Sequence, residues 1–360
     1  MTLEELYQMP PYSLSREEKE RAFCEMLQEM TERHRAACPA YAAMLRAMQY
    51  RAENVLTSDD IPFIPVRMFK EYELLSVPKA EIVKTMTSSG TTGQQVSKIF
   101  LDRENVRRQT KVLSEIITSF IGKQRLPLLL LDTEQVKRDR SMFSARGAGI
   151  IGFTTFGRDV TYALDDQMRL DLGAVREFAE KHRGETVLLF GYTYMIWQFV
   201  VLALEQEDIE IPFESAILFH IGGWKKLKDQ AVDADSFNRR VNAVLGGHVR
   251  IHNYYGMAEQ LGSVFVECEH GHMHCSNYSD VLIRRPIDFS KADIGERGLI
   301  QLLSLLPSSY PGFALLTEDE GEILGVDDCP CGRKGKYFKI HGRIKGAELR
   351  GCSDTYEQRR

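Results

Sequence analysis

Residues 82–93 read Ile-Val-Lys-Thr-Met-Thr-Ser-Ser-Gly-Thr-Thr-Gly, a short apolar run followed at once by small hydroxyl residues and glycines. The run at 82–86 has the length of a β-strand. The loop after it consists of Ser88, Ser89, Gly90, Thr91, Thr92 and Gly93. Because glycine admits positive φ and close backbone approach, successive N–H groups in such a loop can form a concavity that binds phosphate. The stretch predicts a phosphate-binding loop, although an ordinary surface turn has the same composition and the spacing of a Walker loop is absent.

The segments around this loop alternate between two patterns. Strand-length apolar runs lie at 82–86, 126–131, 187–190, 216–221 and 249–253, and helical patterns lie between them at 103–121, 167–182, 195–206 and 230–245. This alternation predicts an α/β fold with a sheet that is rich in parallel strands. Beyond residue 260 the runs follow one another more closely, at 263–267, 281–284, 298–303 and 314–317, which favours a small antiparallel subdomain.

The first 80 residues have a different pattern. Ser15, followed three positions later by Glu18, predicts a helix start with a capping box, and apolar residues at helical spacing continue to about residue 50 with an interruption at Pro39. Residues 61–66 contain Pro62 and Pro65, so they predict an extended connection and not a helix or a central strand. We expect a helical N-terminal annex.

Composition excludes several classes of protein. The 51 acidic and 46 basic side chains leave a net charge of −5, which gives no reason to expect nucleic acid or an anionic membrane as partner. The uncharged stretch at 187–204 contains Gly191 and Gln198 and falls short of the ~20 predominantly apolar residues of a membrane span. The N-terminus lacks the order of a signal peptide, and the 7 cysteines are an odd number. We therefore expect a cytoplasmic protein with no integral membrane span and no disulfide framework.

Four later segments form a pattern together with the 88–93 loop. They are residues 220–225 (His-Ile-Gly-Gly-Trp-Lys), 254–259 (Tyr-Tyr-Gly-Met-Ala-Glu), 317–321 (Thr-Glu-Asp-Glu-Gly) and 341–345 (His-Gly-Arg-Ile-Lys). In this order the segments resemble the motifs of the adenylate-forming superfamily, with Ala258 where that motif has threonine. The chain most resembles the bacterial acyl-protein synthetase (LuxE) family, which is related to the phenylacetate–CoA ligases. The resemblance implies an adenylate-forming core that couples a carboxylic acid to AMP with ATP and Mg²⁺.

The chemistry of acid activation indicates what these segments would supply. A carboxylate that attacks the α-phosphorus of ATP meets like charge, so cations and N–H donors must surround the phosphates. The resemblance implies that the 88–93 loop holds the triphosphate, that Glu259 binds Mg²⁺ and that Arg343 donates to ribose or phosphate. Lys98 is the nearby candidate cation, although it lies beyond the family's usual lysine spacing.

The remaining motif residues would hold the adenosine. The resemblance places adenine against the turn at Gly222 and Gly223 and beside Tyr255, and it gives the two ribose hydroxyls to Asp319. The predicted nucleotide-binding set is completed by Tyr254, Gly256, Met257, Arg343 and Lys345.

A second group of residues has metal-ligating chemistry. Cys268, His270, His272, His274 and Cys275 lie within eight positions, and Cys329 and Cys331 follow far downstream. Thiolate and imidazole ligands in a small subdomain fit a structural, four-coordinate Zn²⁺ site. The preferred set is Cys268, His274, Cys329 and Cys331, because related phenylacetate–CoA ligases have a similar pattern; His270, His272 and Cys275 are alternates. Ordinary buried thiols and exposed histidines remain the simpler interpretation, and the lack of His-Glu-x-x-His disfavours a catalytic zinc.

Cys352 is the third feature. It follows Gly351 and precedes a polar tail, which favours an exposed thiol, and Arg350 would favour the nucleophilic thiolate. An acyl-AMP is a reactive mixed anhydride, so a tethered thiolate would react with it at high effective concentration. The LuxE resemblance implies that Cys352 accepts the acyl group before a partner protein, such as an acyl reductase, receives it. Without the resemblance, a surface cysteine without function is the default.

The resemblance also leads to a domain prediction. Adenylate-forming enzymes carry a C-terminal lid after a Gly-Arg hinge, here Gly342-Arg343, but only 17 residues follow Arg343, below the ~50 residues of a domain. We expect a helical annex over 1–80, a catalytic core over 81–340 with the zinc subdomain at about 260–340, and a hinge-like segment with a short tail over 341–360. A full lid domain is expected to be absent.

Together these features predict an enzyme that activates a carboxylic acid, above all a fatty acid, as acyl-AMP and passes the acyl group to its own cysteine and then to a partner protein. Residues 191–197 supply large apolar side chains at a strand end, where an acid would fit, although core packing explains them equally well. One alternative is an acyl-CoA or amide ligase for an aromatic or small acid. Another is a zinc-stabilised nucleotide-binding scaffold without catalysis. The sequence leaves open whether the protein forms an oligomer.

Overall fold

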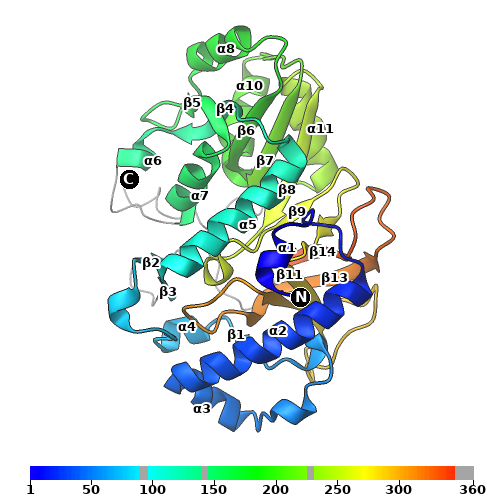
Figure 1. Ribbon diagram of the computed structural model, residues 1–360. Coiled ribbons are helices and arrows are strands. Elements are labelled where there is room, and N and C mark those ends of the chain that lie inside the picture. Colours follow the sequence, from blue (N-terminus) through cyan, green and yellow to red (C-terminus); the bar gives the residue numbers. More distant parts are fainter. Residues whose placement is uncertain (89–95, 139–144, 225–230, 345–360) are drawn as a thin grey trace. The chain divides into compact units, whose positions relative to one another are not determined.

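The computed structural model describes residues 1–88, 96–138, 145–224 and 231–344, and these form two compact units (Figure 1). The first unit combines residues 1–88, 96–120 and 255–344. The second contains the described residues between 121 and 254. Each unit has its own group of strands and its own hydrophobic core.

The second unit is built on a parallel sheet with the strand order β8-β7-β6-β4-β5. Its strands are β4 (Leu126–Thr133), β5 (Gly157–Leu164), β6 (Val187–Tyr192), β7 (Ala216–Ile221) and β8 (Val249–Tyr255). Its helices are α6 (Gln135–Arg138), α7 (Ala145–Thr154), α8 (Leu172–Lys181), α9 (Thr193–Met195), α10 (Leu202–Gln206) and α11 (Ala234–Val244), with a π-helical turn over Ile196–Val201.

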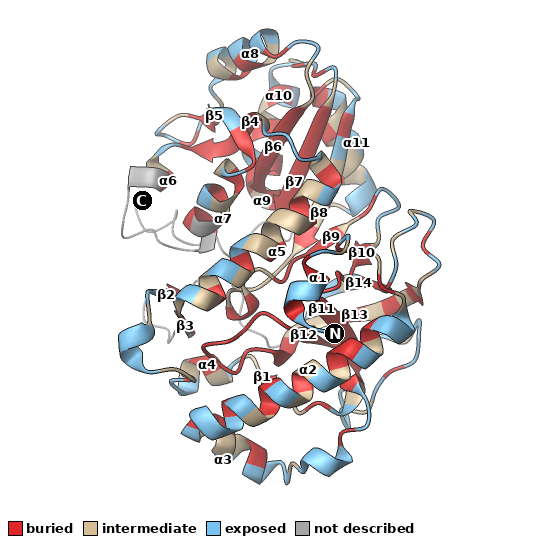
Figure 2. Ribbon diagram, viewed as in Figure 1, coloured by how far each residue is buried: buried red, intermediate tan, exposed pale blue. Residues whose placement is uncertain are grey.

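Both faces of this sheet are covered, as expected for parallel strands. Side chains alternate between the faces along each strand, so Leu189 lies in the cluster with residues of α8, α10 and α11, whereas Phe190 packs under α7. Phe153 of α7 stacks on Phe190 with ring centroids 3.7 Å apart. Figure 2 shows the central strands of this sheet as mostly buried. This arrangement confirms the predicted parallel-rich α/β fold.

The first unit contains an antiparallel sheet with the strand order β11-β12-β13-β14-β10-β9. Its strands are β9 (Phe265–Glu267), β10 (Met273–His274), β11 (Ser279–Arg284), β12 (Gly298–Ser304), β13 (Ala314–Val326) and β14 (Lys336–Arg343), and β1 (Ile64–Pro65) pairs with β13 in parallel. A separate hairpin joins β2 (Lys84–Thr87) to β3 (Lys98–Leu101). The antiparallel pairing predicted for the region beyond residue 260 is confirmed.

The described part of the same unit also contains helices. They are α1 (Leu3–Leu6), α2 (Arg16–Ala37), α3 (Pro39–Ala47), α4 (Met68–Glu71) and α5 (Arg103–Ile121), with 3₁₀ turns at Ala52–Asn54, Ser58–Asp60, Lys79–Glu81 and Ala258–Gln260. Helix α2 begins with the predicted capping box between Ser15 and Glu18 and ends before Pro39. Lys19 of α2 reaches the buried Asp280 at 3.4 Å, and Lys336 reaches the same carboxylate at 2.8 Å. This buried charge cluster fastens the N-terminal helices to the sheet.

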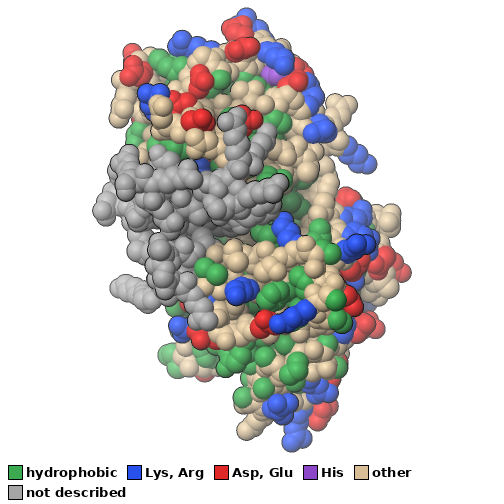
Figure 3. Space-filling view, turned by 90° about the vertical axis from the view of Figure 1, so that its left-hand side faces the viewer, with side chains coloured by type: hydrophobic (Ala, Val, Ile, Leu, Met, Phe, Trp, Pro, Cys, Tyr) green, Lys and Arg blue, Asp and Glu red, His purple; other side chains and the backbone are tan. Residues whose placement is uncertain are grey.

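The structure corrects three details of the predicted elements. The run predicted at 314–317 is the beginning of the much longer strand β13. The helix predicted at 195–206 contains the π-helical turn, and the one predicted at 167–182 begins only at Leu172, because Asp171 caps it by accepting from Ala174 N. In the described part of the chain, no helix has both the length and the apolar character that a bilayer crossing requires. On the face drawn in Figure 3, acidic and basic side chains of the described residues are interspersed.

Candidate active site and metal centre

In the sequence, the predicted phosphate loop falls between strands β2 and β3, which pair as a hairpin. At its base Ser88 N–H donates to Ser97 O at 3.1 Å, and Ser97 N–H donates to Ser88 Oγ at 3.0 Å. The predicted strand before the loop is confirmed as β2, whereas Ser89, Gly90, Thr91, Thr92 and Gly93 lie outside the described residues. Lys98 pairs with Thr87 across the hairpin, and its side chain is exposed.

Glu259 lies in the 3₁₀ turn after β8 and is only 7% exposed. Burial raises the pKa of its carboxyl group above the ordinary value, while the Ser97 hydroxyl and the cations Lys70 and Arg343 act in the opposite direction. Next to it, Gln260 donates from Nε2 to Gly312 O at 2.7 Å, which fixes the turn. A buried carboxylate facing cations is suited to bind a divalent metal or to hold a proton.

The loop before β13 closes around this carboxylate. A Cβ at Gly312 would lie 2.8 Å from Glu259 O, so the close approach of the two backbones requires glycine there. The fully buried Tyr310 is the neighbouring ring, and burial together with Glu259 raises the pKa of its hydroxyl. The sequence did not identify Tyr310, Lys70 or Ser97 as residues of the site. No local pattern marks these residues, since each reaches Glu259 only through the tertiary fold.

Tyr255, Asp319 and Arg343 form a chain of contacts in the first unit. The Tyr255 hydroxyl donates to Asp319 Oδ2 at 2.6 Å, and Arg343 Nε lies 3.7 Å from Asp319 Oδ1. The antiparallel register of β13 and β14 places Asp319 opposite Arg343. Burial raises the pKa of the Asp319 carboxyl, whereas the Tyr255 hydroxyl and Arg343 act to lower it. Three residues predicted to bind the nucleotide are thereby brought together.

The segment around Arg343 has a local structure that the sequence did not predict. His341, Gly342 and Arg343 are the last residues of strand β14, and His341 Nε2 lies 3.0 Å from Glu322 Oε1 on β13. Gly342 has a φ of +116°, a backbone conformation that favours glycine. Lys345 and Cys352 lie outside the described residues, so their predicted roles stay predictions.

Gly256 and Met257 connect the end of β8 to Glu259. A Cβ at Gly256 would meet Ser263 O at 3.5 Å, which is ordinary contact. Met257 is half-buried and packs against the core of the antiparallel sheet. Both residues therefore position Tyr255 and Glu259 through the backbone.

The predicted turn at Gly222 and Gly223 lies in the second unit, at the carboxyl end of β7. Gly222 has a φ of +87°, and both glycines are exposed. Thr193 Oγ1 donates to Gly222 O at 2.7 Å, so the turn is tied to the end of β6. Tyr254 ends β8 in this unit as a buried ring that stacks on Phe153, with centroids 5.9 Å apart.

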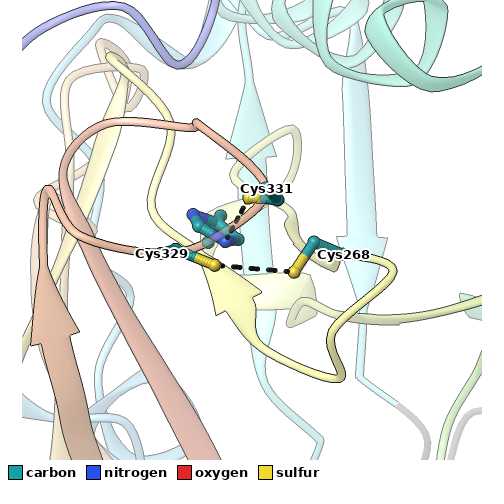
Figure 4. Close-up of side chains that lie close together, drawn as sticks. Cys268, Cys329 and Cys331 are labelled. Atoms are coloured by element: carbon teal, nitrogen blue, oxygen red, sulfur yellow. Dashed lines mark hydrogen bonds between the residues drawn. The ribbon is translucent and has the colours of Figure 1, made fainter.

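Four metal-ligating side chains converge in the first unit, and Figure 4 shows Cys268, Cys329 and Cys331 around an imidazole ring. The ligand atoms of Cys268, His274, Cys329 and Cys331 all lie within 4.8 Å of one another. Cys268 Sγ is 3.9 Å from Cys329 Sγ, and Cys331 Sγ is 3.3 Å from His274 Nε2. Tetrahedral Zn²⁺, with bonds of about 2.3 Å to sulfur and about 2.0 Å to nitrogen, requires ligand separations of this size. The donor set therefore fits a four-coordinate metal.

The local fold explains this convergence. Cys268 follows β9, His274 ends β10, and the other two cysteines lie in the loop between β13 and β14, next to these strands in the sheet. Burial raises the pKa of the Cys268 thiol, and burial raises the pKa of Cys329 to about 12. Burial also acts to raise the pKa of Cys331, but hydrogen bonds from Arg333 bring it below the ordinary value.

The three residues predicted as alternative zinc ligands are not among the four clustered ligands. Cys275 points into the apolar core of the sheet, where burial raises the pKa of its thiol strongly. His270 contributes its backbone N–H, which donates to Cys268 Sγ at 3.4 Å. His272 borders the cluster, with Nδ1 3.3 Å from Cys329 Sγ.

Comparison with solved structures identifies the fold. The crystal structure of an open conformation of 2-hydroxyisobutyryl-CoA ligase, in complex with 2-HIB-AMP and CoA, is similar to this chain with a TM-score of 0.70 and 14% sequence identity. The similarity covers 92% of this chain and 71% of that one. The fold is that of the adenylate-forming ligases, as the sequence predicted.

Comparison of sequences gives the family. The chain belongs to the acyl-protein synthetase (LuxE) family, whose model matches residues 3–360. A long-chain-fatty-acid–luciferin-component ligase from Vibrio harveyi is 24% identical over 85% of this chain and 80% of its own length. The protein of the same name from Aliivibrio fischeri is 22% identical over the same shares. The predicted family is thereby confirmed.

Proposed function

We propose that this protein activates a long-chain fatty acid with ATP, releasing pyrophosphate, and transfers the acyl group from acyl-AMP to its own cysteine and then to a partner protein. The observation that carries the proposal is the contact chain of Tyr255, Asp319 and Arg343 beside Glu259, found in a member of the LuxE family. The names of the two bacterial relatives support fatty acid as the acid and a further protein component as the acceptor.

The first unit holds the residues to which we assign the nucleotide chemistry. Asp319 accepts the ribose hydroxyls, and the Tyr255 hydroxyl fixes its carboxylate. Arg343 donates to the phosphate or ribose oxygens through its guanidinium fork. We assign Glu259 as the ligand for Mg²⁺, because burial raises the pKa of its carboxyl group and a bound cation would stabilise the ionised form. When bound, Mg²⁺ neutralises charge on the phosphate oxygens.

The transfer step is assigned to Cys352. Its thiolate attacks the carbonyl carbon of the acyl-AMP, the bond from that carbon to the phosphate oxygen breaks, and AMP leaves with the electron pair. The product is an acyl thioester, which a nucleophile of the partner protein, an acyl reductase in our proposal, takes over in the same kind of exchange. We expect Arg350, two positions before Cys352 in the sequence, to favour the thiolate.

The Cys/His cluster is assigned a structural Zn²⁺. Four protein ligands leave no open position for substrate, which is the arrangement of structural zinc sites. The cation would join the turn after β9 to the loop between β13 and β14, close to the strands that carry Asp319 and Arg343.

The test of the proposed function is acid-dependent exchange of labelled pyrophosphate into ATP. A panel of fatty, aromatic and small acids should support exchange best with a long-chain fatty acid, and Asp319→Asn should abolish it. If only aromatic or small acids support exchange, the substrate is an acid of that class and not a fatty acid. If no acid supports exchange, the chain is a binding scaffold and the proposal fails.

The transfer step has its own readout. After incubation with ATP and the best acid, mass spectrometry should find a thioester on the peptide that contains Cys352, and Cys352→Ala should lack it while keeping exchange. A wild-type peptide that is never acylated, with acyl transfer to CoA or an amine instead, would contradict self-acylation.

A further inference from the structure

A side-chain contact extends the parallel ladder between β6 and β7. Along this ladder Tyr192 pairs with Ile221, so the next rung would join Thr193 to Gly222. The backbone of β6 turns into helix α9 at that point, but Thr193 Oγ1 donates to Gly222 O at 2.7 Å. The Thr193 hydroxyl therefore makes the hydrogen bond between the two strands that the backbone no longer makes.

His220 completes this contact. Its Nδ1 lies 2.9 Å from Thr193 Oγ1, and Ile221 O lies 3.3 Å from the same oxygen. With the hydroxyl proton directed to the nearest carbonyl, Gly222 O, the Nδ1–H tautomer of His220 is the donor to Thr193 Oγ1. Thr193 and His220 are each only 6% exposed. Removal of the hydroxyl would leave the buried ring nitrogen of His220 without this partner, which is costly. We call Thr193, His220 and Gly222 the threonine clasp.

The other end of the same turn is held by an aromatic contact. Trp224 meets Trp197 edge to face with ring centroids 5.2 Å apart, and it meets Phe237 in the same manner at 6.2 Å. Among residues 220–224 only Gly222 and Gly223 are exposed. The turn is thus anchored at both ends, and its glycine backbone is open between them.

We propose that the threonine clasp is a positioning device for the nucleobase: Thr193 fixes the orientation of the Gly222 turn so that adenine can lie against its open backbone. The inference rests on the proposed function, which assigns this protein an adenine nucleotide. Thr193 is a positioning residue, because it acts through Gly222 and its hydroxyl is already occupied. Because the turn is already ordered before the nucleotide binds, binding does not have to supply the free energy of ordering it. The clasp should therefore affect nucleotide affinity more than the rate of the chemical step.

The test compares Thr193→Val, which keeps the shape but lacks the hydroxyl, with Thr193→Ser, which restores it. For Thr193→Val we expect the Kd of AMP, measured by calorimetry without acid, and the KM for ATP in pyrophosphate exchange to rise about tenfold, which corresponds to about 1.4 kcal/mol. The kcat and the KM for the acid should change less than about twofold, and Thr193→Ser should remain close to wild type.

A matched control lies at the opposite end of the same two strands. Thr186 Oγ1 lies 3.0 Å from Ser215 Oγ, just before β6 and β7 begin, so Thr186→Val removes a similar bond away from the turn. It should leave AMP affinity unchanged. If Thr193→Val does not fold, Thr193→Ala serves as the second variant without the hydroxyl. If the folded variant binds AMP as tightly as wild type, or if the KM for the acid rises as much as the KM for ATP, the proposed role of Thr193 is wrong. If the wild-type protein itself binds no AMP, the proposed function is wrong.

Discussion

The hydroxyl of Tyr255 donates a 2.6 Å hydrogen bond to Oδ2 of Asp319, a residue 64 positions further along the chain. The carboxylate is 14% exposed at its side chain, and Arg343 lies 3.7 Å from its other oxygen. A charge-assisted bond of this length holds the carboxylate in one orientation. Both residues were predicted to bind the nucleotide, but only the fold reveals that one positions the other.

Tyr255→Phe should therefore weaken recognition of the ribose. We expect the KM for ATP to rise about three- to tenfold, because one lost hydrogen bond to a charged group is worth about 1.5 kcal/mol or more. The preference for ATP over 2′-deoxy-ATP should fall, because Asp319 is no longer aligned with both hydroxyls. Pyrophosphate exchange with the two nucleotides gives the measurement.

The control for this variant is Tyr278→Phe. The Tyr278 hydroxyl is buried in the same unit and donates to Leu6 O at 3.3 Å, away from Asp319. It should change stability without changing nucleotide preference. Equal effects of the two variants on the ATP preference would contradict the assigned role of Tyr255.

Glu259→Gln should separate activity from folding. The substitution keeps the shape of the side chain and removes a charge that burial disfavours, so the melting temperature should stay within about 2 °C of wild type or rise. Turnover that depends on Mg²⁺ should fall at least 100-fold, which corresponds to about 2.7 kcal/mol of transition-state stabilisation. Differential scanning fluorimetry and pyrophosphate exchange over a range of Mg²⁺ provide both readouts. A parallel loss of stability and activity would show that Glu259 is structural.

Much of the fold follows from local patterns in the sequence. Helix α5 and strand β7 have the bounds that apolar periodicity predicts, because each buries one continuous apolar face or run. Strand β5 was not predicted, since its residues Arg158 and Asp159 make it polar at one end. The length of β13 was missed for a similar reason, because acidic residues and glycines interrupt its apolar pattern. Strand β14 was not predicted at all, since basic residues interrupt its short apolar runs.

The candidate site was predictable only in part. Motif resemblance selected Tyr255, Asp319 and Glu259, and the cysteine spacing selected the four side chains that the fold brings together. Lys70 and Tyr310 were missed because their relation to Glu259 depends on how α4 and the loop before β13 pack, which leaves no mark at any fixed spacing. Long-range packing of this kind is outside the reach of local patterns.

Acid should destabilise the protein through His34. Nε2 of His34 lies 3.3 Å from Pro307 O, and Nδ1 lies 2.7 Å from the Ser76 hydroxyl. The neutral ring satisfies both contacts, with Nε2–H as donor to the carbonyl and Nδ1 as acceptor from the hydroxyl. Burial, with the nearby Arg33, lowers the pKa of His34 from 6.5 to about 3. Between these values the unfolded chain binds the additional proton, so the stability that neutral His34 contributes is complete above pH 6.5 and is lost progressively as the pH falls.

His34→Gln should flatten this pH dependence. We expect the fall in the free energy of unfolding below about pH 6 to become shallower by up to about 1.4 kcal/mol per pH unit, the value for one proton. Urea unfolding at pH 7, 6 and 5 measures the slope. His248→Gln, at an exposed site before β8, should keep the wild-type slope. An unchanged slope in His34→Gln would mean that other groups cause the acid sensitivity.

Removal of metal should destabilise the first unit if the Cys/His cluster holds zinc. Four ligands from two separate segments are cross-linked by one cation, so its loss removes several kcal/mol and should lower the melting temperature by at least about 5 °C. Elemental analysis should find one zinc per chain, and Cys331→Ser should reduce both metal content and melting temperature. Cys24→Ser is the control, because Cys24 lies on α2 and is not among the four clustered ligands. Zinc in Cys331→Ser at the wild-type level, or a melting temperature that a strong chelator leaves unchanged, would show that these thiols and the imidazole are ordinary parts of the core.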